Sequence, residues 1–324
     1  MFSRLTSFFL FLALPFCAGA KDFLNWSESS GQGAFSFLEI FQGARTVGLS
    51  GAGGSIPSTD PLSVAVNPAV LQRSHFHQYF AADWQTGALA EDHGLLAWNL
   101  TLGMYMVQTT VGWVQVDKIW QTDESSDTTG NTFSPTSQYL AFTTVVPSTH
   151  FWMGATLKFI RDQLWNDDTY GDQAAWGIGG DLGLVWKSPF PRFGAGLSVL
   201  DLGRQVSSYL KDGEENYALN TRIRISGHYR PAQIRGMTLA LDAEFPRYSQ
   251  PSWHAGLEYL PIPSLSLRAG ATRTIAHPTS TSQQWNLFNA GFGLLWRSFS
   301  FDYALQVLTD NLGIRHQFGL QTGF

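Results

Sequence analysis

The sequence has little charge, a single cysteine and no long apolar run beyond its first twenty residues. Only 14% of its 324 residues are charged, against about 25% in a typical soluble domain. Its aromatic content of 14% is unlike that of a disordered chain, which has few aromatics and many charges. A helical membrane protein would need runs of about 18 apolar residues, so that class is disfavoured. The net charge of −5 gives no reason to expect a nucleic-acid partner.

Residues 1–20 predict a secretory signal peptide. Arg4 supplies the positive charge, Phe8 to Phe16 form an apolar stretch too short to span a membrane, and Ala18-Gly19-Ala20 is a cleavage site. The only cysteine, Cys17, lies in this segment, where acylation as in a lipoprotein is the alternative. The exported chain, from about Lys21, then has no disulfide and no thiolate metal site, which favours a bacterial envelope protein.

From about residue 75 onward, apolar and polar side chains alternate. Leu265, Leu267 and Ala269, for example, are interleaved with Ser266 and Arg268. Strict alternation predicts strands with one apolar and one polar face. Fourteen such strands are expected, at about 75–84, 94–100, 102–116, 136–146, 150–160, 174–187, 192–200, 219–230, 235–245, 251–260, 264–274, 286–297, 299–308 and 313–324.

The connections between these strands alternate in length. The even-numbered ones are short, as at Thr101, 147–149, 261–263 and Ser298. Most odd-numbered ones are longer and polar, at 117–135, 161–173, 201–218 and 275–285. Short periplasmic turns and long extracellular loops are typical of a transmembrane β-barrel, whereas a soluble sandwich has no reason to sort its loops this way. The sequence therefore predicts an all-β protein, an antiparallel transmembrane barrel of about fourteen strands in the outer membrane of a Gram-negative-type bacterium.

Aromatic residues support this interpretation. If both termini are periplasmic, the even-numbered strands end at the periplasmic interface, where an aromatic girdle is expected. The last lipid-facing residues of these strands are Trp186, Tyr229, Tyr259, Trp296 and Phe324. The alternating final strand ending in Phe324 resembles the C-terminal signature of bacterial outer-membrane barrels. The expected partners are outer-membrane lipid and lipopolysaccharide.

Residues 21–74 lack the two-residue period and are predicted to form a plug, or hatch, inside the barrel formed by residues 75–324. The segment carries a glycine-rich run, an acidic residue and an Asn-Pro-Ala box, with the key residues Gly43, Ala44, Arg45, Gly48, Gly51, Gly53, Gly54, Asp60, Asn67, Pro68 and Ala69. The run is unlike a phosphate-binding loop, because no Gly-Lys-Ser/Thr follows it.

These residues resemble the N-terminal signature of PorV/PorQ outer-membrane proteins, and the related FadL-type transporters have a similar segment ending in Asn-Pro-Ala. The family's paired acidic residues are reduced here to Asp60, and Val70 replaces the usual glycine. The resemblance implies a monomeric barrel that supports type IX secretion or cell-surface protein attachment, with secretion-system or surface-attachment proteins as partners. The FadL-type alternative is passive transport of hydrophobic molecules such as long-chain fatty acids.

Charged residues on the polar strand faces are expected in the lumen, because each Arg or Lys near the midplane of the lipid face would cost roughly 2–4 kcal/mol. They are Lys158, Asp181, Arg222, Arg224, Asp242, Glu244, Glu258, Arg268, Asp302 and Arg315. They could fill and rigidify a plugged barrel, or line a polar path. A hydrophobic conduit would instead need an apolar pocket at the boundary of hatch and barrel, to which Trp152 and Leu295, with hatch residues Phe35 to Phe41, could contribute. The third strand is apolar on both faces, so it either packs on the hatch or lines a lateral opening.

No catalytic, metal or cofactor site is expected. Ser74-His75 and the pair Ser252 and His254 bring a serine close to a histidine, but not in a recognisable catalytic setting. Residues 166–172 resemble a calcium loop without its full ligand set. Acidic residues at Asp123, Glu124 and Asp127 could face divalent ions among lipopolysaccharide.

Overall fold

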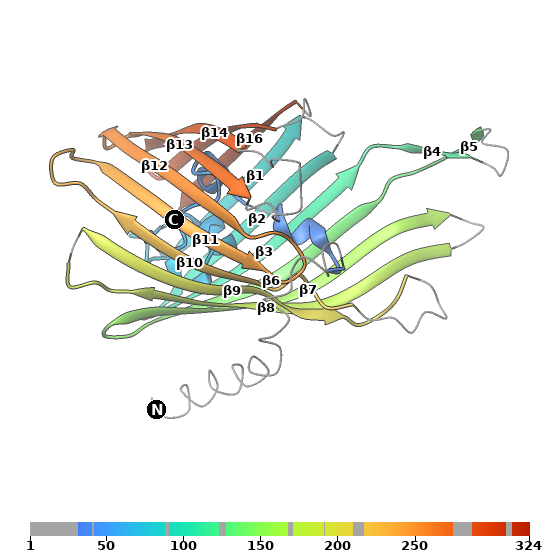
Figure 1. Cartoon of the computed structure of the whole chain (residues 1–324), viewed down its shortest axis with the longest axis horizontal. Helices are drawn as coiled ribbons and strands as arrows, with labels where there is room; N and C mark the ends of the chain where they lie inside the picture. Colours follow the sequence, from blue (N-terminus) through green and yellow to red (C-terminus); the bar gives the residue numbers. More distant parts are fainter. Residues whose placement is uncertain are drawn as a thin grey trace.

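The computed structural model describes residues 32–40, 42–87, 91–122, 128–167, 171–190, 192–209, 217–274, 287–308 and 313–324. The predicted signal peptide at 1–20 and the acidic residues Asp123, Glu124 and Asp127 lie outside the described residues. The predicted fold class is confirmed, because fourteen antiparallel strands close into a barrel (Figure 1).

Each barrel strand pairs with its sequence neighbours, and the first strand pairs with the last, Tyr79 opposite Gly323. The strands are β1 (Gln78–Gly87), β2 (Glu91–Leu102), β3 (Tyr105–Val116), β6 (Thr136–Pro147), β7 (Phe151–Asp167), β8 (Gly171–Trp186), β9 (Phe193–Gln205), β10 (Arg222–Tyr229), β11 (Met237–Pro246), β12 (Ser252–Ile262), β13 (Leu265–Thr274), β14 (Leu287–Trp296), β15 (Phe299–Val307) and β16 (Ile314–Gly323). We call the rim with the short connections, such as that between β14 and β15, the turn end, and the opposite rim the loop end.

Strand boundaries differ from the sequence predictions in several places; β7 and β9, for example, extend to Asp167 and Gln205, beyond the predicted ends at 160 and 200. The turn between β2 and β3 is at Gly103, which has a φ of 64°, and not at Thr101, because glycine adopts this left-handed conformation without strain. β1 begins at Gln78, three residues later than predicted. The predicted loop 117–135 contains a hairpin of β4 (Ile119–Thr122) and β5 (Thr128–Phe133), which extends well beyond the barrel at its loop end (Figure 1).

The barrel strands present an apolar face outward and a polar face inward. In β10, Ile225 is 55% exposed on the outer face, whereas Arg222 and Arg224 are buried inside. Other large apolar side chains with more than a third of their surface exposed include Trp84, Leu96, Phe142 and Trp176. Such an apolar outer surface needs acyl chains around it, as in a transmembrane barrel.

The hatch, which we define as the described residues 32–40 and 42–74, lies inside the barrel and contains four short helices joined by turns. They are η3 (Ser36–Glu39), α2 (Ala44–Gly48), η4 (Pro61–Ala65) and η5 (Pro68–Val70). Asp60 and Asn67 start η4 and η5, since their side chains accept from the amides two residues later at 2.9 Å and a proline follows each. Among the described residues, none of the helices has both the length and the apolarity needed to cross a bilayer.

Candidate functional site

The hatch lies closest to the barrel wall where inward-facing wall residues are glycines. A Cβ at Gly183 would lie 2.1 Å from Asn67 Oδ1, and one at Gly154 would lie 2.4 Å from the carbonyl carbon of Pro68. Opposite the glycine-rich run, a Cβ at Gly196 would lie 2.3 Å from the carbonyl oxygen of Gly54. The Asn-Pro-Ala box therefore docks on β7 and β8, because only glycine leaves room for its backbone there.

The glycine-rich run of the hatch exposes backbone amides and carbonyls to charged wall residues. The amides of Gly53 and Gly54 donate to Asp242 Oδ2 at 3.2 and 2.9 Å, and Arg224 donates to the carbonyl of Gly51. Gly51 and Gly53 have φ values of 81° and 130°, which side chains rarely adopt. Gly43 and Gly48 border α2, where a Cβ at Gly43 would lie 2.6 Å from Leu62 Cβ.

Arg45 joins the hatch to the wall near the turn end. Its Nε and Nη2 donate to the two carboxylate oxygens of Glu258 at 3.1 and 2.9 Å. Glu258 also accepts from Arg268 Nε at 2.9 Å, and Arg268 pairs with Asp302 at 2.5 Å. Burial, together with the nearby carboxylate of Asp302, raises the pKa of hatch residue Asp60 to about 6. This row of alternating charges holds α2 against β12, β13 and β15.

A second row of charges crosses β7 to β11. Lys158 Nζ lies 2.8 Å from Asp181 and 2.6 Å from Asp201, and Arg222 lies 2.5 Å from the other oxygen of Asp201. Arg222 also lies 3.7 Å from Glu244. Farther along the row, Arg224 pairs with Glu244 and, at 3.4 Å, with Asp242. Arg315 lies apart from both rows, half-buried on the inner face of β16 near the loop end.

Two buried aspartates in these contacts were not predicted from the sequence: Asp201, which pairs with Lys158 and Arg222, and Asp83, which contacts the hatch. Asp201 was assigned to the loop 201–218, but it lies in β9 at a bulge opposite Asp181, with a φ of 55°. Asp83 accepts from the Ala44 amide at 2.8 Å. Asp83 follows Ala81 on the inner face of β1, so the period-two pattern could have found it.

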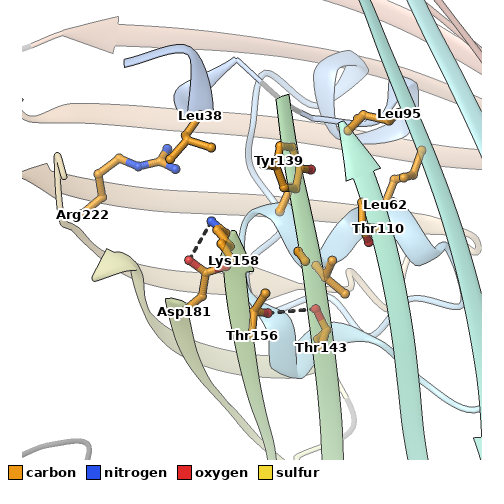
Figure 2. Close-up of a pocket in the computed structure, with 13 residues that line it drawn as sticks. Leu38, Leu62, Leu95, Thr110, Tyr139, Thr143, Thr156, Lys158, Asp181 and Arg222 are labelled. Atoms are coloured by element: carbon orange, nitrogen blue, oxygen red, sulfur yellow. Dashed lines mark hydrogen bonds and ion pairs between the residues drawn. The ribbon is translucent and has the colours of Figure 1, made fainter. Parts of the chain in front are cut away.

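A narrow cavity separates the hatch from the wall formed by β2, β3, β6, β7 and β8 (Figure 2). One side of this lumen cavity is apolar and includes Leu38, Leu62 and Leu95. The other side carries Lys158, Asp181 and Arg222, and three threonines also line the cavity, with Thr110 beside Leu62 and with Thr143 and Thr156 next to each other. The cavity volume is about 30 Å³, room for roughly two water molecules, so a larger molecule passes only when side chains of the hatch or the wall move.

A wider chamber opens at the turn end, and we call it the vestibule. It is lined by hatch residues Arg45 and Asp60, by turn residues such as Pro263, and by Leu295. Asp60 lies on this side of η4, whereas Leu62 of the same helix lines the lumen cavity. The segment 60–65, which we call the septum, therefore separates the two spaces. Of the two residues expected in an apolar pocket, Leu295 lines the vestibule and Trp152 packs on hatch residue Val64 and its neighbours.

The inner face of β3 packs on the hatch. Met106 is in a buried cluster with Val64 and Leu71, and Gln108 donates to the carbonyl of Pro61 at 2.9 Å. β3 pairs continuously with β2 and β6, from Tyr105 to Val116 and from Met106 to Gln115. Of the two sequence interpretations of this strand, the structure therefore supports packing on the hatch and shows no lateral gap along it.

The interface aromatics lie on the outer face near the turn end. Trp186 is 38% exposed, and Trp296 and Phe324 are each 68% exposed. Tyr229 stacks on Phe193 with ring centroids 4.7 Å apart, and Tyr259 is half-buried near the end of β12. Their common height on the barrel is the position at which headgroups would meet aromatic rings.

Ser252 and His254 form a hydrogen bond of 2.9 Å between Oγ and Nε2, while His254 Nδ1 lies 2.8 Å from the carbonyl oxygen of Ser50. Neither the lumen cavity nor the vestibule includes Ser252, so this pair serves to hold the hatch at Ser50. Ser74 caps its own turn by accepting from the Phe76 amide at 3.2 Å. Among the described residues, which include only part of the calcium-like loop 166–172, no group of three or more His, Cys, Asp or Glu side chains could hold a metal ion.

Solved structures of channels share this architecture. No protein-family model matches the chain, and no curated protein matches it in sequence. A deletion mutant of the monoaromatic hydrocarbon channel TodX has a TM-score of 0.66 and 13% identity, covering 87% of this chain and 99% of that one. The monoaromatic hydrocarbon channel CymD has a TM-score of 0.64 and 13% identity over 88% and 98% of the two chains. The toluene transporter TbuX of Ralstonia pickettii has a TM-score of 0.61 and 12% identity over 87% and 98%.

These three likenesses establish the fold and no more, because the identities are low. They give no support to the expected PorV/PorQ membership or to a role in type IX secretion. The neighbours are described as channels and transporters. The chain therefore has the fold of outer-membrane channels: a closed fourteen-stranded barrel.

Proposed function

We propose that this protein is a passive outer-membrane conduit for small hydrophobic molecules. The observation that carries the proposal is the lumen cavity, whose hatch side is apolar and whose septum also borders the vestibule at the turn end. The shared fold with hydrocarbon channels supports the same function. Outer-membrane lipid is the expected surrounding, and no cofactor is required for passive diffusion.

The contacts between the hatch and the wall indicate on which side of the barrel a hydrophobic molecule would pass the hatch. Toward β11–β16 and β1, the hatch is held by charged and amide side chains such as Asp242, Glu258, Asn289 and Asp83. Toward β2, β3 and β6, two buried apolar clusters predominate, one with hatch residue Leu62 and the other with hatch residue Val64. Apolar contacts are non-directional, so side chains there can move without leaving charges unpaired. A molecule would therefore pass between the septum and the wall of β2 to β8.

Gln108 provides a test, because its hydrogen bond to the Pro61 carbonyl ties the septum to β3. One such bond contributes about 0.5–1.5 kcal/mol, so Gln108→Leu should raise the open population of the septum by about 2- to 12-fold. Gln115→Leu is the matched control, since Gln115 is exposed on the same strand.

The measurement is uptake of radiolabelled toluene by cells that lack other hydrocarbon channels and express the wild type, either variant or an empty vector. We expect uptake in the order Gln108→Leu above wild type and Gln115→Leu, with all three above the vector. Uptake by the wild type equal to that of the vector, with folded barrel present in the membrane, would refute the proposed function.

The motif resemblance to PorV/PorQ proteins makes support of type IX secretion or surface attachment the competing proposal. A deletion strain of the native organism separates the two. Normal delivery of surface proteins together with impaired uptake of hydrophobic substrates supports the conduit, whereas loss of surface proteins with normal uptake supports secretion.

A further inference from the structure

We propose that the lumen cavity admits uncharged molecules, such as aromatic alcohols and phenols, and excludes carboxylates, fatty-acid anions included. This inference rests on the proposed function and names the substrate class of the same conduit. It departs from the long-chain fatty acids that the FadL-type resemblance implies, and it follows from the way the cations of the cavity are already paired.

Both cations that line the cavity have carboxylate partners at contact distance. Lys158 Nζ contacts Asp181 and Asp201 at 2.8 and 2.6 Å, and the Lys158 side chain is 12% exposed. Arg222 donates to Asp201 through Nε and Nη2 at 3.1 and 2.5 Å and is 5% exposed. An entering carboxylate would have to share each cation with a buried aspartate that is already in contact with it, so it would gain less from the cation than from an unpaired one.

The charge of the surrounding row also disfavours an anion. Its three cations, Lys158, Arg222 and Arg224, face four carboxyl groups, those of Asp181, Asp201, Asp242 and Glu244. The formal charge of the row is therefore −1 before any ligand enters, and hatch residue Glu39, hydrogen-bonded to Asn220, adds a further carboxyl group beside Arg222. A ligand carboxylate would lose its hydration and meet like charge in a poorly solvated space.

The remaining surface suits an uncharged molecule with a hydroxyl group. Leu38, Leu62 and Leu95 offer an apolar wall for a ring or a short chain. Thr143 and Thr156 join their hydroxyls at 2.9 Å on the opposite side, as the dashed line in Figure 2 shows. A threonine hydroxyl has a donor and two acceptor positions, so one hydrogen bond leaves capacity for a ligand hydroxyl.

The test compares benzyl alcohol with benzoate, which have similar size and differ in charge at pH 7.5. Isothermal titration is done with the full exported chain in lipid nanodiscs, and empty nanodiscs are subtracted to remove partitioning into lipid. We expect benzyl alcohol to bind the wild type at least about tenfold more tightly than benzoate, the ratio that about 1.4 kcal/mol produces.

Asp181→Asn should raise benzoate affinity several-fold and leave benzyl alcohol affinity within about twofold, because it removes one negative charge while Asn still accepts from the Asp201 amide. Asp92→Asn is the control, since Asp92 is exposed on β2. Equal affinities of the wild type for the two ligands, or binding of neither, would overturn the inference even where Asp181→Asn does not fold. Toluene uptake by the wild type would still stand as separate evidence for the conduit.

Discussion

Substitution of Gly183 tests whether the hatch is held by close contact of its backbone with glycines of the wall. In Gly183→Ala, the new methyl would lie 2.1 Å from Asn67 Oδ1 and 2.8 Å from the Ala69 amide nitrogen, whereas ordinary contact begins near 3.4 Å. Both atoms belong to the Asn-Pro-Ala box, and neither can yield without disturbing η5.

The cost of this clash can be worked from the contacts of Asn67. Its side chain donates to the carbonyl of Gly54 at 2.6 Å and accepts from the Ala69 amide at 2.9 Å. Overpacking costs about 1–3 kcal/mol, and each weakened hydrogen bond costs about 0.5–1.5 kcal/mol more. A loss of about 2 kcal/mol in docking free energy raises the undocked population about 30-fold.

Hydrogen exchange measures this population. We expect the amides of Ala69 and Val70 in detergent-solubilised protein to exchange about 30-fold faster in Gly183→Ala, with exchange in the barrel strands unchanged. Gly227→Ala is the matched control, because the nearest atoms to its new methyl lie 3.9 and 4.0 Å away. Exchange at these amides within threefold of wild type in Gly183→Ala would refute the docking argument.

Three further predictions concern pH, charge and barrel closure. Burial raises the pKa of Asp60 to about 6 in the docked hatch, so the docked state is stabilised at low pH, where Asp60 is protonated, and loses that stabilisation as pH rises through 6. The undocked population should therefore grow about tenfold from pH 5 to 7.5. Hydrogen exchange of the hatch amides measures this growth, and Asp60→Asn should remove the pH dependence. Arg45→Met removes two hydrogen bonds to buried Glu258, so the free energy of hatch docking should weaken by about 2–3 kcal/mol. Added protease should then cleave the hatch faster than in the wild type. An unchanged cleavage rate would show that this ion pair does not hold the hatch. The Phe324 amide donates to the Gln78 carbonyl at 3.0 Å, beside the pair of strands β1 and β16 that closes the barrel. Deletion of Phe324 should therefore lower the fraction of protein that migrates as a folded, heat-modifiable barrel on gels. A normal fraction would show that β1 and β16 pair without it.

The sequence alone determined the barrel, its strand number and the direction of its side chains. Apolar and polar residues alternate along every strand because one face of the strand contacts lipid and the other faces the interior of the barrel, so the pattern can be read locally in the sequence. The lengths of the connections are equally local, and they separate the two rims. Even the hatch could be located, because residues such as Gly53 and Asn67 interrupt that alternation.

Only the tertiary structure decided which inward residues meet the hatch and which meet one another. Asp201, Lys158 and Arg222 come from three strands, and nothing in their spacing reveals that one carboxylate pairs with two cations. Gly183 is likewise one inward glycine among several until Asn67 is seen against it. A lumen-facing position has the same pattern whether it binds a plug, pairs a charge or borders a cavity, because these roles depend on contacts between residues far apart in the chain.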